Sequence, residues 1–170
     1  MRPIYLIVCC LGAAYPAAES HAETAKSFRI SADVVAGCSV LSDASGRWGL
    51  IDLGTVDGAS PATVEAGLVS ASGAGLAIEC TPGVTAALSV DLGDHSSGGT
   101  RMLARSGGSG AIPYQLYAAD GSTPWNLQPL PLQFGAGVSR RSIPVRARAT
   151  LTGAIPAGLY TDTVRVTLSW

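Results

Sequence analysis

The chain has 170 residues, of which 11 are Lys or Arg and 12 are Asp or Glu, and its formal net charge at pH 7 is −1. This balance excludes the strongly basic character of a nucleic-acid-binding protein and gives no indication of an anionic membrane surface as a partner. The 21 glycines, the near absence of lysine and the lack of sustained helical periodicity favour an all-β fold with short strands and Gly/Pro/Ser turns.

The first 22 residues have the pattern of a secretory signal peptide. Arg2 precedes an apolar run over 4–14, and small residues at 20–22 provide a cleavage site. The run is too short for a transmembrane helix. Lipidation of Cys9 or Cys10 fits less well, because neither follows the small residue that precedes a lipidated cysteine. We therefore expect this segment to be removed on export.

Two cysteines, Cys38 and Cys80, remain after this cleavage. In an exported protein an even pair predicts one disulfide. By closing the loop between the two cysteines, it would stabilise the fold by about 4 kcal/mol in the chain-entropy model. A metal site would need more ligands than the mature chain offers, because His95 is its single histidine. We expect no metal and no cofactor.

Period-two alternation predicts a strand directly after the expected cleavage site. One face of residues 28–36 carries Phe28, Ile30, Ala32 and Val34. Further strands are expected at 48–56, 76–80, 84–92, 112–118 and 142–151, with a short segment at 101–104. Turn residues at 57–61, 81–83, 93–99, 106–110 and 120–122 separate them, and a proline-rich loop carries Trp125 and residues 129–131. Short strands at this spacing predict a β-sandwich.

The last predicted strand covers residues 160–170. Its inward face consists of Tyr160, Val164, Val166, Leu168 and Trp170, with polar residues between most of them. Such an apolar face normally continues into a partner strand, yet the sequence stops at Trp170. We expect either an ordinary edge strand or one whose neighbour comes from elsewhere.

No catalytic constellation is visible. Asp94-His95-Ser96 contains the residue types of a hydrolase triad, but three consecutive residues cannot take the three spatial roles, so we interpret them as a solvated turn. The acids are scattered over strand ends and turns, and we expect most of them to have turn or cap roles (Asp52, Asp91, Asp120 and Asp162). Arg146 and Arg148 share a strand face, which fits a solvated sheet better than an acidic-glycan site. We expect no enzymatic activity.

Several motifs together resemble the spore coat protein U domain family, which includes the pilins of archaic, Csu-like chaperone–usher pili. The resemblance covers nearly the whole mature length, with Leu53 replacing the usual phenylalanine and Trp170 the commoner Phe or Tyr. The motifs are Cys38-Ser39-Val40, Leu53-Gly54, Glu79-Cys80-Thr81-Pro82-Gly83, Asp91-Leu92-Gly93, Arg101-Met102, Pro113-Tyr114-Gln115-Leu116-Tyr117, Trp125 and Gly158-Leu159-Tyr160-Thr161-Asp162-Thr163-Val164.

The resemblance implies an immunoglobulin-like β-sandwich over 38–170 that lacks its final strand. In such a pilin a periplasmic chaperone first binds the subunit, and at the outer-membrane usher the N-terminal segment of the next subunit completes it. Here residues 23–37 would be the donor, offering Phe28, Ile30, Ala32 and Val34 to the groove beside 160–170. The expected product is an extracellular fimbrium of repeated or related pilin subunits, supporting adhesion and biofilm formation.

Two other interpretations stay open at this point. In one, residues 23–37 pair with the open edge of their own domain, which would make a self-complemented secreted coat protein. In the other, loops around Arg101 or Trp125 bind a glycan, which would make an adhesion module. A single pilin-like domain argues against a two-domain tip adhesin.

Overall fold

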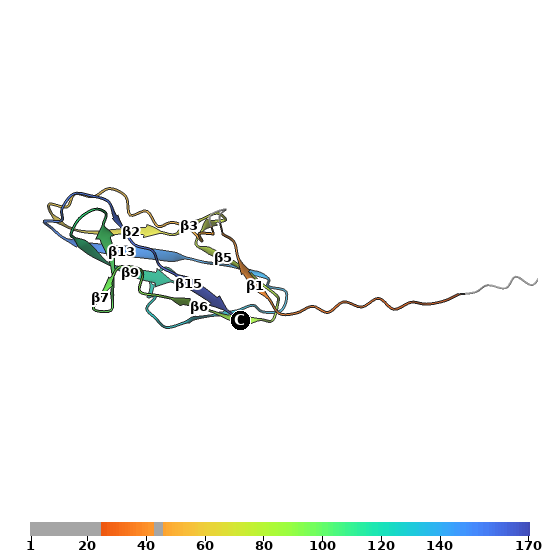
Figure 1. Ribbon diagram of the computed structural model, residues 1–170. Helices are drawn as coiled ribbons and strands as arrows, with labels where there is room; N and C mark the ends of the chain where they lie inside the picture. The colour runs from red at the N-terminus through yellow and green to blue at the C-terminus, as the bar shows by residue number, and fades with distance from the viewer. Residues whose placement is uncertain (1–24, 43–45) are drawn as a thin grey trace, which may run out of the picture. The chain divides into compact units, whose positions relative to one another are not determined.

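The computed structural model describes residues 25–42 and 46–170, so the predicted signal peptide and the first two donor residues lie outside the described residues. The chain divides into two units, 1–33 and 34–170, and the strands found in the described residues all belong to the second (Figure 1). These strands are β1 (Cys38–Val40), β2 (Pro61–Gly67), β3 (Val69–Ser70), β4 (Gly73–Ala74), β5 (Leu76–Cys80), β6 (Thr85–Val90), β7 (Ser96–Ser97), β8 (Thr100–Arg105), β9 (Ala111–Ala118), β10 (Thr123–Pro124), β11 (Leu130–Gln133), β12 (Arg140–Ile143), β13 (Val145–Thr152), β14 (Tyr160–Thr161) and β15 (Val166–Ser169).

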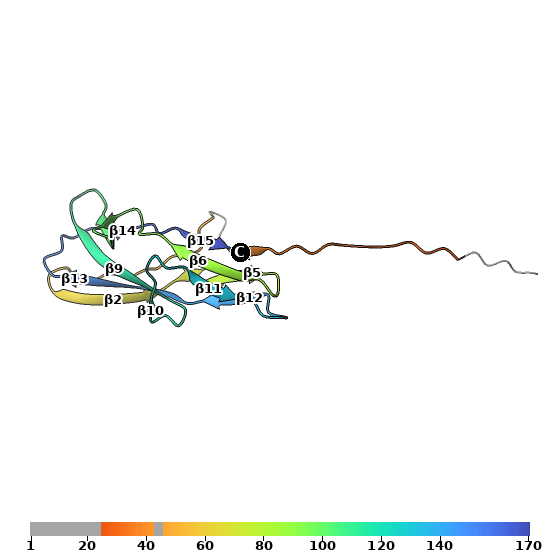
Figure 2. The same cartoon turned by 90° about the horizontal axis from the view of Figure 1, so that it is seen from below.

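The strands of this second unit form a β-sandwich. Its largest sheet has the order β14-β8-β9-β13-β2, with β10 paired to β9 and β7 paired to β8. Figure 2 shows β9, β13 and β2 of this sheet side by side. Two three-stranded sheets have the orders β1-β5-β12 and β11-β6-β15, and β3 pairs with β4. The pairings are antiparallel, and most of them join segments that are far apart in the sequence.

The core lies between these sheets, and strand alternation explains its composition. In β9 and β13 every second residue is buried, whereas the residues between them face outward or are half-buried. Leu88 of β6, Ile78 of β5 and Phe134 are fully buried in the same cluster. One continuous apolar core therefore joins β5, β6, β9 and β13.

The all-β prediction is confirmed, and four expected strands lie close to their predicted places. Residues 76–80, 84–92, 112–118 and 142–151 overlap with β5, β6, β9 and the β12–β13 pair, whose outer bounds differ from the predicted ones by at most two residues. Pro144 separates β12 from β13, because proline cannot donate to a strand ladder. The segment expected at 101–104 is part of β8.

The strand expected at 48–56 is wrong. This stretch contributes only an isolated bridge between Leu50 and Val69 within the described residues. The Asp52 carboxylate accepts the N–H of Gly54, which has a positive φ of 76°. Such a local turn competes with strand pairing.

Several strands were not predicted, and β2 and β11 are the longest of them. The sequence signal of β2 is weak because its alternating residues are mostly small, and Val64 is the only larger aliphatic residue in Pro61–Gly67. β11 lies within the proline-rich loop, where Pro131 is tolerated because β11 is the edge of its sheet.

Residues 25–37 contain no strand in the structure, although their alternation predicts one. A strand exists only when its backbone groups pair with a neighbour, so period-two patterning without a partner gives extended chain. Across the described part of the chain there is also no helix with the length and hydrophobicity to span a bilayer.

Candidate strand-acceptor groove

Among the edge strands of the domain, β15 and β1 are the two that matter here. β15 is the last strand of the β11-β6-β15 sheet, and β1 is the last strand of the β1-β5-β12 sheet. In both views the end of β15 lies close to the start of β1 (Figures 1 and 2). Open edges of this kind can accept a further strand.

A groove of about 380 Å³ lies between these two edges. We call it the acceptor groove. Its lining residues are Cys38, Ser39, Val40, Trp48, Val166, Thr167, Leu168 and Trp170. Most of these side chains are apolar, and Val40, Trp48, Val166 and Leu168 also pack against the core. The groove is thus continuous with the hydrophobic interior.

The register of β15 directs unpaired backbone groups into the groove. The Asp91 N–H donates to the Arg165 carbonyl at 3.1 Å, and Val166 and Leu168 lie opposite Val90 and Leu88. Because hydrogen-bonded pairs alternate along an antiparallel ladder, the backbone groups of Val166 and Leu168 point away from β6. An incoming strand would find donors and acceptors there.

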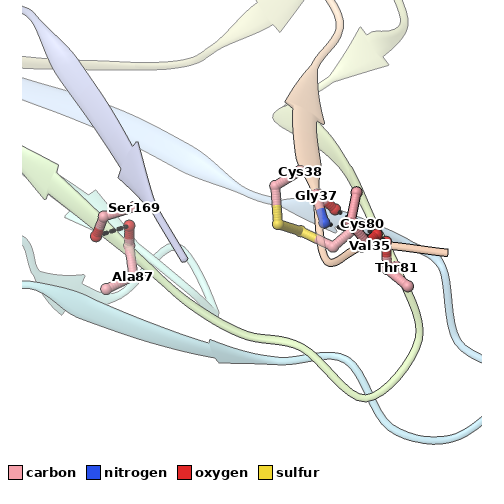
Figure 3. Close-up of a disulfide and its surroundings, with 7 residues drawn as sticks. All are labelled: Val35, Gly37, Cys38, Cys80, Thr81, Ala87 and Ser169. Carbon is pink, nitrogen blue, oxygen red and sulfur yellow. Dashed lines mark hydrogen bonds between the residues drawn. A yellow bond between two sulfur atoms is a disulfide. The ribbon is translucent and has the colours of Figure 1, made fainter. Parts of the chain in front are cut away.

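The opposite wall is fixed by the disulfide of Cys38 and Cys80, which confirms the predicted bridge (Figure 3). The two cysteines lie directly opposite each other in the β1–β5 pair. Next to them the Thr81 N–H donates to the Gly37 carbonyl at 2.9 Å, and the Thr81 hydroxyl donates to the Val35 carbonyl at 3.3 Å. These contacts fix the backbone from Val35 onward.

The acceptor positions proposed from sequence occupy two strands rather than one. Tyr160 lies in β14, while Val166 and Leu168 lie in β15; these three and Val164 are half-buried against the core. Trp170 lines the groove but is 60% exposed, so its indole is largely uncovered.

The apolar donor positions are open to solvent. Phe28, Ile30 and Val34 are 84%, 83% and 86% exposed, and Ala32 is exposed as well. Large apolar side chains of this number in one short segment indicate a binding role. Because residues 25–37 pair with no strand in the structure, their assignment as a donor is a proposal, which is developed below.

Sequence reasoning overlooked part of the groove. Ser39 and Val40 stood out only as part of a family motif, and Thr167 and Trp48 only as members of expected strands, yet all four line the groove. The lone tryptophan at the start of a predicted strand was the only sequence signal for this part of the groove. The four residues lie close together only because segments distant in the sequence pair with one another.

Asp162 is a buried hydrogen-bond centre, whereas Asp52, Asp91 and Asp120 accept local turn hydrogen bonds as most of these acids were expected to do. Its side chain is 1% exposed and accepts hydrogen bonds from the Tyr114 hydroxyl at 2.7 Å and the His95 N–H at 3.0 Å. The ring Nδ1 of His95 lies 3.1 Å from the same carboxylate.

Charged residues on the outer sheet face pair with one another. Glu65 lies 2.7 Å from Arg148 and 3.0 Å from Arg146, and hydrogen bonds from Arg148 and then Arg146 lower the pKa of Glu65. The guanidinium of Arg148 also stacks over Tyr117 at 4.8 Å from the ring centroid. This arrangement is a solvated face on which one carboxylate pairs with two guanidinium groups.

The side chains around which a glycan site was considered are not accessible. Arg101 and Trp125 are each 4% exposed and belong to the interior. In the described residues no three or more His, Cys, Asp or Glu side chains are grouped to hold a metal ion.

Comparisons with known proteins agree with this architecture. The profile of the Spore Coat Protein U domain family matches residues 24–167. No curated protein matches the chain. The fold is similar to a chain in the crystal structure of the CsuC–CsuE chaperone–tip adhesion subunit pre-assembly complex from archaic chaperone–usher Csu pili of Acinetobacter baumannii, with 19% sequence identity and a TM-score of 0.51. That match covers 81% of this chain and 40% of the other. With most of its length matched, the chain belongs to the spore coat protein U domain family.

Proposed function

We propose that this protein is a non-enzymatic structural subunit of an archaic chaperone–usher pilus. The observation that carries the proposal is the open edge of β15, whose unpaired backbone groups line an apolar groove continuous with the core. Such an edge binds an extended segment by main-chain hydrogen bonds and alternate side-chain contacts.

The donor that fits best is residues 23–37 of another subunit. Phe28, Ile30, Ala32 and Val34 occupy alternate positions and span about 20 Å in an extended chain. The apolar residues at 164, 166, 168 and 170 cover the same number of positions. A donor strand can therefore meet the whole acceptor edge in register.

The expected burial energy is large enough to matter. Burying Phe28, Ile30 and Val34 at about 1.5–3 kcal/mol each gives roughly 5–9 kcal/mol before the entropic cost of ordering the segment. This is comparable to the stability of a whole small domain. An unoccupied groove would leave the subunit marginally stable.

Assembly from such contacts produces a fibre. Each subunit has a donor at one end and an acceptor groove elsewhere, and repeating this heterologous contact builds an open filament. The pilus interpretation places a periplasmic chaperone and an outer-membrane usher as partners, with other pilin subunits in the fibre. The fibre would lie on the cell surface and support adhesion and biofilm formation.

The test is self-association of the intact mature protein. We expect multimers whose size grows with concentration, measured by size-exclusion chromatography with light scattering and by electron microscopy. Ile30→Asp should block their formation, because a charge would enter the apolar groove. Ser31→Asp is the matched control, since it places the same charge on the opposite face of the donor strand.

Two results would contradict the proposal. A stable monomer whose residues 23–37 are protected from proteolysis would support self-complementation instead. Equal assembly of Ile30→Asp and Ser31→Asp would remove the donor assignment.

A further inference from the structure

The last two strands cross from one sheet to another. β14 pairs with β8 in the large sheet, whereas β15 pairs with β6. Residues 162–165 connect them without belonging to a strand. This crossover places the strand that forms one wall of the acceptor groove.

A loop at 91–95 binds the crossover along its length. The Asp94 N–H donates to the Thr163 carbonyl at 3.0 Å, and the Arg165 N–H donates to the Asp91 carboxylate at 2.9 Å. The guanidinium of Arg165 lies 2.7 Å from the Asp94 carboxylate. At the start of the crossover, Asp162 accepts the hydrogen bonds from His95 and Tyr114. We call these contacts between 91–95 and 162–165, with Tyr114, the polar junction.

A buried cation supports the polar junction from behind. Arg101 donates to the Asp91 carbonyl at 2.9 Å and to the Trp125 carbonyl at 3.1 Å. Burial lowers the pKa of Arg101, while Tyr114, Asp91 and Asp162 oppose this effect. A carboxylate as buried as that of Asp162 needs such compensation.

Close approach to Asp162 also requires a glycine. Gly93 has a φ of 81°, and a Cβ at that position would overlap the Asp162 carboxylate. The loop and the carboxylate are therefore matched in shape as well as in hydrogen bonding.

We infer that Asp162 is a positioning residue for the acceptor edge, holding the crossover so that β15 is extended before a donor arrives. β15 has four residues and one partner strand, so it would fray without an anchor at its start. A preordered edge spares an incoming donor the entropic cost of ordering it. This inference rests on the proposed acceptor function.

Asp162→Asn is the principal test, made in the full chain carrying Ile30→Asp so that its own donor segment is blocked. The first readout is the affinity for a synthetic peptide of residues 23–37. Loss of a charged, buried hydrogen-bond partner predicts about 10- to 100-fold weaker binding. Tyr114→Phe should weaken binding less, because the carboxylate keeps its other donors.

The second readout is amide hydrogen exchange without peptide. Thr167 and Ser169 should exchange faster in Asp162→Asn, because their N–H groups bond to β6 only while β15 is held in place. Amides in β13 should be affected much less than those in β15, because they exchange only when the whole domain unfolds. Asp120→Asn is the matched control, since it alters an exposed carboxylate that accepts turn hydrogen bonds from Ser122 and Thr123.

The outcomes separate the two ideas. If Asp162→Asn and Tyr114→Phe bind the peptide as tightly as the parent does, the positioning role is overturned. The donor-strand function is then unaffected. Equally faster exchange in β13 and β15 would also overturn it, because Asp162 would then stabilise the whole domain. If the parent does not bind the peptide, the proposed function is contradicted. Amide exchange would then still test the role of Asp162, because faster exchange confined to β15 in Asp162→Asn would support a positioning role. If Asp162→Asn does not fold, Tyr114→Phe carries both readouts.

Discussion

Tyr114 and Asp162, 48 positions apart in the sequence, are joined by a hydrogen bond of 2.7 Å between the phenol Oη and the carboxylate Oδ2. Burial, and then this hydrogen bond, raise the pKa of Tyr114 far above its ordinary value. The phenol therefore keeps its proton and donates this hydrogen bond at neutral pH. One buried polar contact thus connects β9 to the crossover that leads into the acceptor edge.

Tyr114→Phe should lower the free energy of unfolding by about 1.5–3 kcal/mol, because a buried carboxylate loses a donor. Urea denaturation measures this change. Tyr117→Phe is the control, since its hydroxyl makes a long, exposed contact of 3.4 Å with Arg148, and we expect a change within about 0.5 kcal/mol. Equal losses in the two variants would contradict the importance of the Asp162 contact.

Asp91 should make the domain sensitive to acid. Desolvation opposes ionisation of Asp91, but hydrogen bonds from the backbone of Arg165 and Gly93 outweigh it and bring its pKa below 3.8. A lowered folded-state pKa gives stability that is present above the unfolded-state value and lost as the pH falls through the folded-state value.

The corresponding variant is Asp91→Asn. When the pH is lowered from about 6 to about 3, the free energy of unfolding of this variant should fall less than that of the parent. Urea denaturation at each pH measures the difference. Asp57→Asn is the control, because Asp57 accepts the Ala59 N–H in an exposed turn. The assignment to Asp91 is wrong if its variant keeps the acid sensitivity of the parent.

Removing the disulfide should affect both stability and binding. Cys38→Ala with Cys80→Ala should cost about 2–5 kcal/mol, since the bridge closes a loop with a sequence separation of 42. Peptide binding should weaken as well, because β1 forms a wall of the groove. Thermal melting and peptide titration measure the two effects. Retained stability in the double variant would show that the β1–β5 pairing alone holds this wall.

The buried face of β6 should be highly sensitive to truncation. Leu88→Ala removes a fully buried side chain and should cost about 2–5 kcal/mol. Leu127→Ala makes the same chemical change at a side chain that is 55% exposed, and its effect should stay within about 0.5 kcal/mol. Similar costs at both sites, measured by urea denaturation, would mean that Leu88 does not occupy the core as described.

Much of the fold could be predicted because its signals are local. Alternation in 84–92 and 112–118 corresponds to β6 and β9, and the cysteine pair corresponds to the bridge between β1 and β5. Local patterning failed at 48–56, where an Asp52 turn replaced the strand, and at β2, whose small residues gave a weak signal.

The sequence by itself determined the all-β class, the cysteine pair, the apolar face of 160–170 and the matching alternation in 28–34, because side-chain alternation is a property of one strand alone. Only the tertiary structure decided that β14 and β15 belong to different sheets, that β1 and Trp48 form the groove with β15, and that Asp162 is buried. These features depend on hydrogen bonds and packing between residues far apart in the chain, such as His95 and Asp162, 67 positions apart. No local pattern encodes such a pairing, and the physical reason is that a buried carboxylate differs from an exposed one only through its surroundings.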